Sequence, residues 1–170
     1  MRYAVVDVET AGLSFDHDEI LEIAIVTVEG GAIQEQWVSL VRPTNPVSLR
    51  ATKIHGIDND LLMTAPRKEL VAREARSRLG GAIIVEHSQN GFDSKFLARF
   101  LGAEPWRGSM STLNMARSLY PKLGKYDLPA VCSHLGVELN AQHQAASDAL
   151  ATAKILVRML EAGFDGWPTR

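Results

Sequence analysis

The chain has only one cysteine, Cys132, and no long hydrophobic run among its 170 residues. A single cysteine excludes an internal disulfide and any zinc cluster built from cysteines. No apolar run approaches the ~18 residues that a membrane-spanning helix needs. Asp7 also interrupts the apolar start of the chain, where a signal peptide would carry its hydrophobic core. We therefore expect a cytoplasmic protein with no membrane association.

Excess positive charge is also missing, because 18 basic and 20 acidic side chains give a formal net charge of −2. This excludes a general basic field that would hold a long nucleic acid by counterion release, but a substrate held at one end remains compatible. The composition, 46% hydrophobic and 22% charged, is typical of a soluble globular protein. Without repeats or linkers, we expect one domain over residues 1–170, with a core at about 3–160 and a C-terminal tail at 163–170.

The pattern of apolar residues predicts an α/β fold with a mixed sheet. Three strands are expected first, at residues 4–10, 20–28 and 32–41, as an antiparallel meander. Two short helices at 49–54 and 59–63 precede a helix at 66–79, which places Pro66 in its first turn and Leu70 on its apolar face. The remaining elements are strands at 82–85 and near 106–110, and helices at 92–101, 112–120, 127–135 and 145–160. A meander followed by alternating helices and strands indicates a mixed sheet between helices.

The first strand carries two carboxylates near its end, Asp7 and Glu9. Side chains alternate between the faces of a strand, so these two acids point the same way and repel each other. A divalent cation such as magnesium or manganese would relieve that repulsion, because hard cations prefer carboxylate oxygens. The alternative is that both acids lie in a loop beyond the strand and face solvent.

Three further residues belong with this pair. Asp93 opens the helix at 92–101, where capping and the helix dipole alone would favour an acid. Asp148 lies at the edge of the apolar face of the last helix, where burial of a carboxylate needs a reason. His143 precedes that helix and could be an ordinary solvent-exposed histidine. Together, however, four carboxylates are the ligand set of two divalent ions that catalyse phosphoryl hydrolysis, with the histidine as general base.

The motifs that carry these residues resemble those of the DnaQ-like (DEDDh) 3′–5′ exonucleases of the ribonuclease H-like superfamily. They are Asp7-Val8-Glu9-Thr10-Ala11-Gly12-Leu13, Phe92-Asp93 and His143-Gln144-Ala145-Ala146-Ser147-Asp148-Ala149. Ile54-His55-Gly56-Ile57 and Tyr126-Asp127-Leu128 match between them, so the resemblance extends from Tyr3 to Leu160. It implies a ribonuclease H-like fold, with a five-stranded mixed sheet flanked by helices.

The resemblance also implies a role for each residue. Asp7 would be shared by two ions, Mg²⁺ or Mn²⁺, while Glu9 and Asp148 would complete the site of the ion that activates water. Asp93 would hold the second ion through water, and His143 would be the general base. The 3′-terminal residue would lie in a pocket formed by Thr10, Gly12, Leu13, Ile54 and His55. One departure stands out, because Ser88 and Gln89 occupy the places of a His-Asn pair usual in the family.

The expected function is a metal-dependent 3′–5′ exonuclease that releases nucleoside 5′-monophosphates from a single-stranded or frayed 3′ end of DNA or RNA. A DNA polymerase subunit is a candidate partner. The first alternative is a nucleic-acid-binding or polymerase-associated proofreading module with little catalysis, but such a protein has no need for four clustered carboxylates. A ribonuclease H-type endonuclease would share the fold and the metals but leaves the spacing of His143 and Asp148 unexplained.

Overall fold

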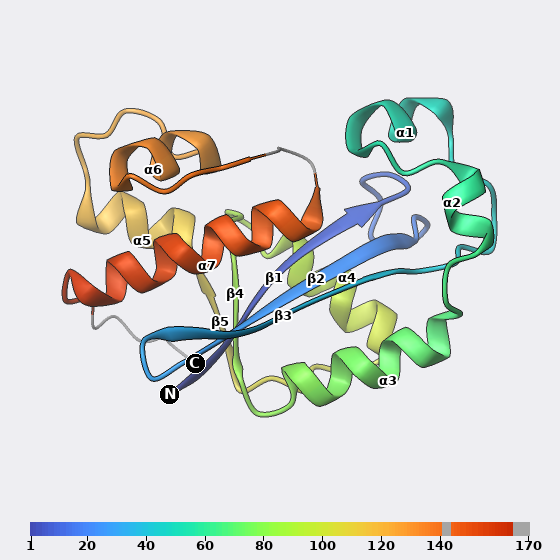
Figure 1. The fold of residues 1–170 in the computed structure, drawn as a ribbon, viewed down its shortest axis with the longest axis horizontal. Coiled ribbons are helices and arrows are strands. Elements are labelled where there is room, and N and C mark those ends of the chain that lie inside the picture. The colour runs from blue at the N-terminus through green and yellow to red at the C-terminus, as the bar shows by residue number, and fades with distance from the viewer. Residues whose placement is uncertain (141–143, 165–170) are drawn as a thin grey trace.

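A five-stranded mixed sheet forms the centre of the structure, a computed structural model that describes residues 1–140 and 144–164 (Figure 1). The strands are β1 (Arg2–Thr10), β2 (Ile20–Glu29), β3 (Ala32–Leu40), β4 (Ile83–Glu86) and β5 (Gly108–Ser111). Their order across the sheet is β3-β2-β1-β4-β5. The pairs β1–β2 and β2–β3 are antiparallel, whereas β1–β4 and β4–β5 are parallel. The predicted mixed sheet is therefore confirmed.

Strand β1 occupies the middle of the sheet, and its side chains alternate between two separate cores. Val6 and Val8 belong to the core on one face, whereas Val5 belongs to the core on the opposite face. This alternation places Asp7 and Glu9 on the face of Val5. The two acids therefore point toward whichever helices cover that face.

Helices cover both faces of the sheet (Figure 1). The helices α5 (Thr112–Leu119), α6 (Leu128–Leu135) and α7 (Ala145–Glu161) pack on the face of Val5, and α7 crosses β1 and β2. The opposite face is covered by α3 (Lys68–Leu79) and α4 (Phe92–Leu101). Among the helices in the described part of the chain, none is long and apolar enough to cross a lipid bilayer.

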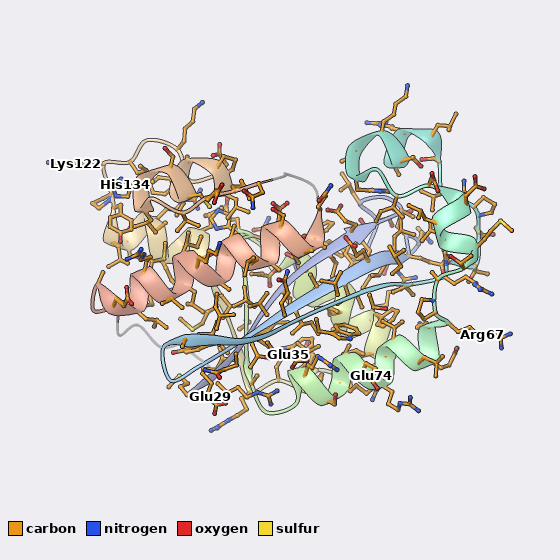
Figure 2. All side chains as sticks on the ribbon, viewed as in Figure 1. Glu29, Glu35, Arg67, Glu74, Lys122 and His134 are labelled. Atoms are coloured by element: carbon orange, nitrogen blue, oxygen red, sulfur yellow. The ribbon has the colours of Figure 1, made fainter. Side chains whose placement is uncertain are left out.

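Helix α3 departs from the sequence prediction at its start. It begins at Lys68, so Pro66 lies before the helix, and Leu70 is exposed because the buried side chains are Val71, Ala75 and Leu79. Near the end of α3, the side chain of Arg78 links the helix to the sheet. Arg78 forms ion pairs of 3.0 Å with Glu74 in the same helix and with Glu35 on β3, two acids that are labelled in Figure 2.

Two short helices, α1 (Leu49–His55) and α2 (Asn59–Met63), lie beyond the C-terminal end of β1 (Figure 1). They have a small core of their own, made by Leu21, Val47, Ala51, Ile57 and Leu62. The hydroxyl of Ser48 caps the start of α1 by accepting from the N–H of Ala51, and Gly56 ends it with φ +75°. Glycine adopts this left-handed conformation at little cost, so α1 ends at His55. His55 lines the same cavity as Glu9, near the end of β1.

Candidate active site

Three of the predicted metal ligands meet at the end of β1. Asp7, Glu9 and Asp148 each place one carboxylate oxygen so that the three atoms lie within 4.8 Å of one another. The first two extend from β1, and Asp148 comes from the first turn of α7. All three are partly buried. A cation between them would have at least three hard oxygen ligands, which is a donor set that suits Mg²⁺ or Mn²⁺.

The electrostatics of this cluster favour protonation unless a cation is present. Burial, and then the charges of Asp93, Asp148, Glu9 and Glu22, raise the pKa of Asp7 well above its usual range. Burial, followed by the charges of Glu22 and Asp148, raises the pKa of Glu9 to about 7. Because bound divalent ions favour the charged form of each acid, the chemistry of the cluster fits a metal site.

The fourth predicted ligand, Asp93, contacts β1 from the helix layer on the opposite face of the sheet. It is buried near the start of α4, and its carboxylate accepts a hydrogen bond of 3.0 Å from the backbone N–H of Val8. Val8 lies between Asp7 and Glu9 in β1, so Asp93 is tied to the strand that carries the other acids. Its own oxygens lie outside the group of three described above.

The departure at Ser88 and Gln89 is accommodated by a different local network. Glu86 is buried at the end of β4, and its Oε2 accepts hydrogen bonds from the backbone N–H of Asp93 at 2.9 Å and from the hydroxyl of Ser88 at 2.8 Å. The same hydroxyl accepts from the N–H groups of Gly91 and Phe92. Ser88 therefore satisfies the N–H groups of the N-cap residue Gly91 and of Phe92, the first residue of α4. Burial, and then the charge of Glu86, raise the pKa of Asp93.

Sequence reasoning missed Glu86, and it also missed Glu22. It is paired directly opposite Glu9 in the β1–β2 ladder, and its carboxylate accepts from the backbone N–H of Ala145 at 3.2 Å. Burial raises the pKa of Glu22, while the hydrogen bond from Ala145 lowers it. A signal was present, because Glu22 is the one charged residue in the apolar run from Ile20 to Val28.

A cavity of about 560 Å³ opens beside the acids. The five residues predicted for the nucleotide pocket all line it, and so does the ligand candidate Glu9; the rest of its wall consists of Val8, Ala11, Ser48, Arg50, Ala51 and Phe92. Leu13 and Ile54 are 80% and 57% exposed, an unusual state for large apolar side chains at a cavity. The volume falls within the usual range for small-molecule sites.

His55 gives this cavity one polar group with a defined character. Its Nδ1 accepts from the backbone N–H of Ile57 at 3.0 Å, so in the neutral ring the proton is on Nε2. That Nε2 is buried and has no hydrogen-bond partner among the described residues. Burial lowers the pKa of His55 and keeps the ring neutral. His55 is thus part of the cavity wall, and its unpaired N–H is covered by neighbouring atoms.

The loop after β1 is held tightly around the cavity. The hydroxyl of Thr10 donates to the carbonyl of Gly12 at 2.6 Å, and Arg99 of α4 donates to the carbonyls of Phe15 and Asp18. A Cβ at Gly12 would lie no more than 2.9 Å from both carboxylate oxygens of Asp18. A larger residue at position 12 would therefore have to displace the carboxylate of Asp18. His143, the predicted general base, lies outside the described residues.

The mixed sheet, with acids at the end of its central strand and helices on both faces, defines a ribonuclease H-like fold of the kind found in nucleases. Residues 4–156 match the model of the RNase T family, described as "Exonuclease", and the chain belongs to that family.

The names of similar proteins are consistent with membership of this family. The chain is 34% identical over 162 residues to DNA polymerase III subunit epsilon of Aquifex aeolicus, a match that covers 94% of this chain and 80% of the relative. It is 36% identical over 164 residues to DNA polymerase III PolC-type of Bacillus subtilis, but spans only 11% of that longer protein. A solved structure of exonuclease X in complex with 5′-overhanging duplex DNA superposes with a TM-score of 0.75 at 30% identity, covering 97% and 93% of the two chains.

Proposed function

We propose that this chain is a metal-dependent 3′–5′ exonuclease that releases nucleoside 5′-monophosphates. The observation that carries the proposal is the position of Glu9, which belongs both to the acid cluster and to the wall of the cavity. A terminal nucleoside in the cavity would place its 5′-phosphate beside the carboxylates. The bond that breaks is then the one joining the last nucleotide to the rest of the strand.

The carboxylates divide into two ligand sets in this proposal. Asp7, Glu9 and Asp148 would hold one divalent ion, and Asp7 with Asp93 would hold the other. When bound, two such ions lower the pKa of the attacking water and stabilise the leaving oxygen. The residues of the chain fix the positions of these charges, because β1 is central in the sheet and Asp93 is hydrogen-bonded to it.

His143 takes the proton of the attacking water. The water oxygen attacks the phosphorus, the P–O3′ bond breaks, and the leaving O3′ takes a proton from solvent water to become the new 3′-hydroxyl end. A neutral histidine with a pKa near ~6.5 is suited to accept a proton at neutral pH.

The cavity supplies recognition of the strand end. Its exposed apolar residues Leu13 and Ile54, together with Phe92, offer flat apolar contacts to a base and sugar. His55 forms part of the same cavity wall. None of these contacts demands a particular base, which suits an enzyme that removes one nucleotide after another.

DNA is the first substrate to test, because the named relatives are DNA polymerase III subunits and exonuclease X is solved with DNA. RNA remains the second candidate. A DNA polymerase subunit is the proposed partner, since similar sequence occurs as a segment of PolC-type polymerases.

The test is digestion of a 5′-labelled single-stranded oligonucleotide in the presence of Mn²⁺ or Mg²⁺. A free 3′-hydroxyl strand should shorten one nucleotide at a time, while a 3′-phosphorylated strand and a circle should resist. Matched DNA and RNA oligonucleotides separate the two substrate classes, and Asp7→Ala is the inactive control. Rapid cutting of the circle would instead support an endonuclease.

A further inference from the structure

The first turn of α7 carries Asp148 but lacks a cap of its own. Its N-cap residue, Gln144, makes no side-chain hydrogen bond to the turn. Helix starts leave several backbone N–H groups unsatisfied, and such turns fray unless other groups hold them. In this structure two side chains from the sheet reach the turn instead.

The first of these side chains is Glu22 on β2. Its carboxylate accepts from the N–H of Ala145, the first residue of α7. The carboxylate also lies at the positive end of a 17-residue helix, where the helix dipole favours an anion. Glu22 therefore supplies from outside the helix what an N-cap side chain normally supplies.

The second side chain is Gln36 on β3. Its Nε2 donates to the carbonyl of Ala146 at 2.8 Å, one residue further into the helix. Ala145 is itself fully buried against the sheet. The turn is thus held in three ways. Glu22 accepts from the N–H of Ala145, Gln36 donates to the carbonyl of Ala146, and the side chain of Ala145 is buried.

We propose that Glu22 and Gln36 are positioning residues that fix the first turn of α7, so that Asp148 lies within metal-ligating distance of Asp7 and Glu9. The proposal rests on the exonuclease function argued above, since it assigns these carboxylates to a metal. Asp148 is three residues beyond Ala145, less than one turn of helix. A shift of the turn by one ångström therefore moves Asp148 by a similar amount relative to β1.

The hydrogen bond, rather than the charge, is the feature that matters at position 22. Glu22 lies opposite Glu9, so its negative charge adds repulsion to the cluster. Glutamine at this position would keep an oxygen that accepts from Ala145 while removing the charge. The two functions of the side chain can therefore be separated by a single substitution.

The experiment measures Mn²⁺ binding by titration calorimetry without nucleic acid, and then kcat and KM on an oligonucleotide. Glu22→Ala should weaken Mn²⁺ binding and lower kcat about tenfold, with KM little changed, as is typical when a group that orients a metal ligand is lost. Glu22→Gln should restore both to within about threefold of wild type. Gln36→Leu should show a smaller loss of the same kind.

Gln34→Leu is the matched control, because Gln34 is an exposed glutamine on the same strand that bonds only to carbonyls of Glu29 and Ala32. It should bind Mn²⁺ like wild type. The proposal is overturned if Glu22→Ala and Gln36→Leu both bind Mn²⁺ normally, or if Glu22→Gln loses as much as Glu22→Ala, which would make Glu22 a ligand. A wild-type protein that binds Mn²⁺ but digests nothing would defeat the nuclease proposal and leave the positioning test standing.

Discussion

The carboxylate of Asp93, on α4, is hydrogen-bonded at 3.0 Å to the backbone N–H of Val8, the residue between Asp7 and Glu9. An acid from one face of the sheet is thereby tied to the strand whose acids point to the other face. The bond uses the one backbone position in β1 that has a metal-ligand candidate on either side. Asp93 thus has a structural contact as well as its proposed catalytic one, and the two can be tested separately.

Replacing Asp93 with Asn keeps an oxygen that can accept from Val8 but removes the charge. We expect the melting temperature without metal to stay the same or rise, because a buried carboxylate with a raised pKa is lost. Activity should fall by more than about 100-fold, since the proposed second metal loses its charged ligand. Asp93→Leu, which also removes the acceptor, should cost about 1–3 kcal/mol of stability. Equal melting temperatures for the Asn and Leu variants would contradict this assignment.

Ser88→Ala tests the network that stands where the family usually has His-Asn. The substitution leaves the N–H groups of Gly91 and Phe92 without their acceptor and removes a donor from Glu86. We expect a loss of about 1–3 kcal/mol in the free energy of unfolding. The exposed Ser77, which donates only to the carbonyl of Glu74, is the control, and Ser77→Ala should change stability by no more than about 0.5 kcal/mol. Denaturant unfolding of the two variants measures the difference.

The metal-free protein should lose stability as the pH rises from about 4.5 through about 7. The pKa of Glu9 is raised from 4.5 to about 7, so across this window the folded state binds more protons than the unfolded state. Melting temperatures in chelator should therefore fall with pH, and less steeply in Glu9→Gln. Burial lowers the pKa values of His55 and of the half-buried His87, which act in the opposite direction. Both histidines are common to the two proteins, so their effects cancel in the comparison. Added Mn²⁺ should stabilise the wild type most at high pH. Identical slopes for wild type and Glu9→Gln would show that Glu9 does not titrate in this range.

Gly12→Ala should damage the cavity without touching the acids. The new methyl group would collide with the carboxylate of Asp18, which accepts from the N–H of Ser14 and shapes the loop. We expect KM for an oligonucleotide to rise on the order of tenfold, equivalent to about 1.4 kcal/mol of lost binding, with kcat little changed. Removing the obstacle in the double variant Gly12→Ala/Asp18→Ala should recover part of the loss. A double variant with the full KM defect would mean that the collision is not the cause.

His143→Ala should separate proton transfer from metal binding. The melting temperature and the Mn²⁺ affinity should match wild type, while kcat falls about 10²–10⁴-fold. In wild type kcat should rise with pH through about 6.5, and this limb should vanish in the variant. The exposed His17 provides the control, since His17→Ala should leave kcat and its pH profile intact. Loss of Mn²⁺ binding in His143→Ala would make the histidine a ligand or a structural support.

The sequence carried enough to predict the strands, the helices and the mixed sheet, because alternation and helical spacing are local properties of the chain. The resemblance to exonucleases is confirmed by the family match and by the named relatives. The roles of His143 and of the four acids remain predictions. Leu70 shows where local reasoning failed. The sequence pattern places it on the apolar face of α3, yet it is exposed because the side chains that face the sheet are Val71, Ala75 and Leu79, spaced four residues apart.

Glu22 and Glu86 were missed for a different reason. Each acts through a hydrogen bond to the backbone of a distant residue, Ala145 for Glu22, or of the neighbouring helix, Asp93 for Glu86. A backbone partner leaves no mark in the sequence, because any residue type except proline can supply an N–H. Only the relative placement of the strand and the helix start reveals such contacts.

The acids that meet at the end of β1 lie far apart in the sequence. Asp148 follows Asp7 and Glu9 by some 140 residues and belongs to α7. A nascent chain therefore cannot assemble this site until α7 has emerged and docked on the sheet. Long-range contacts of this kind form late and slowly in folding. Nuclease activity would thus appear only after α7 has docked, and a chain released before Asp148 would lack one of the three carboxylates that meet at the end of β1.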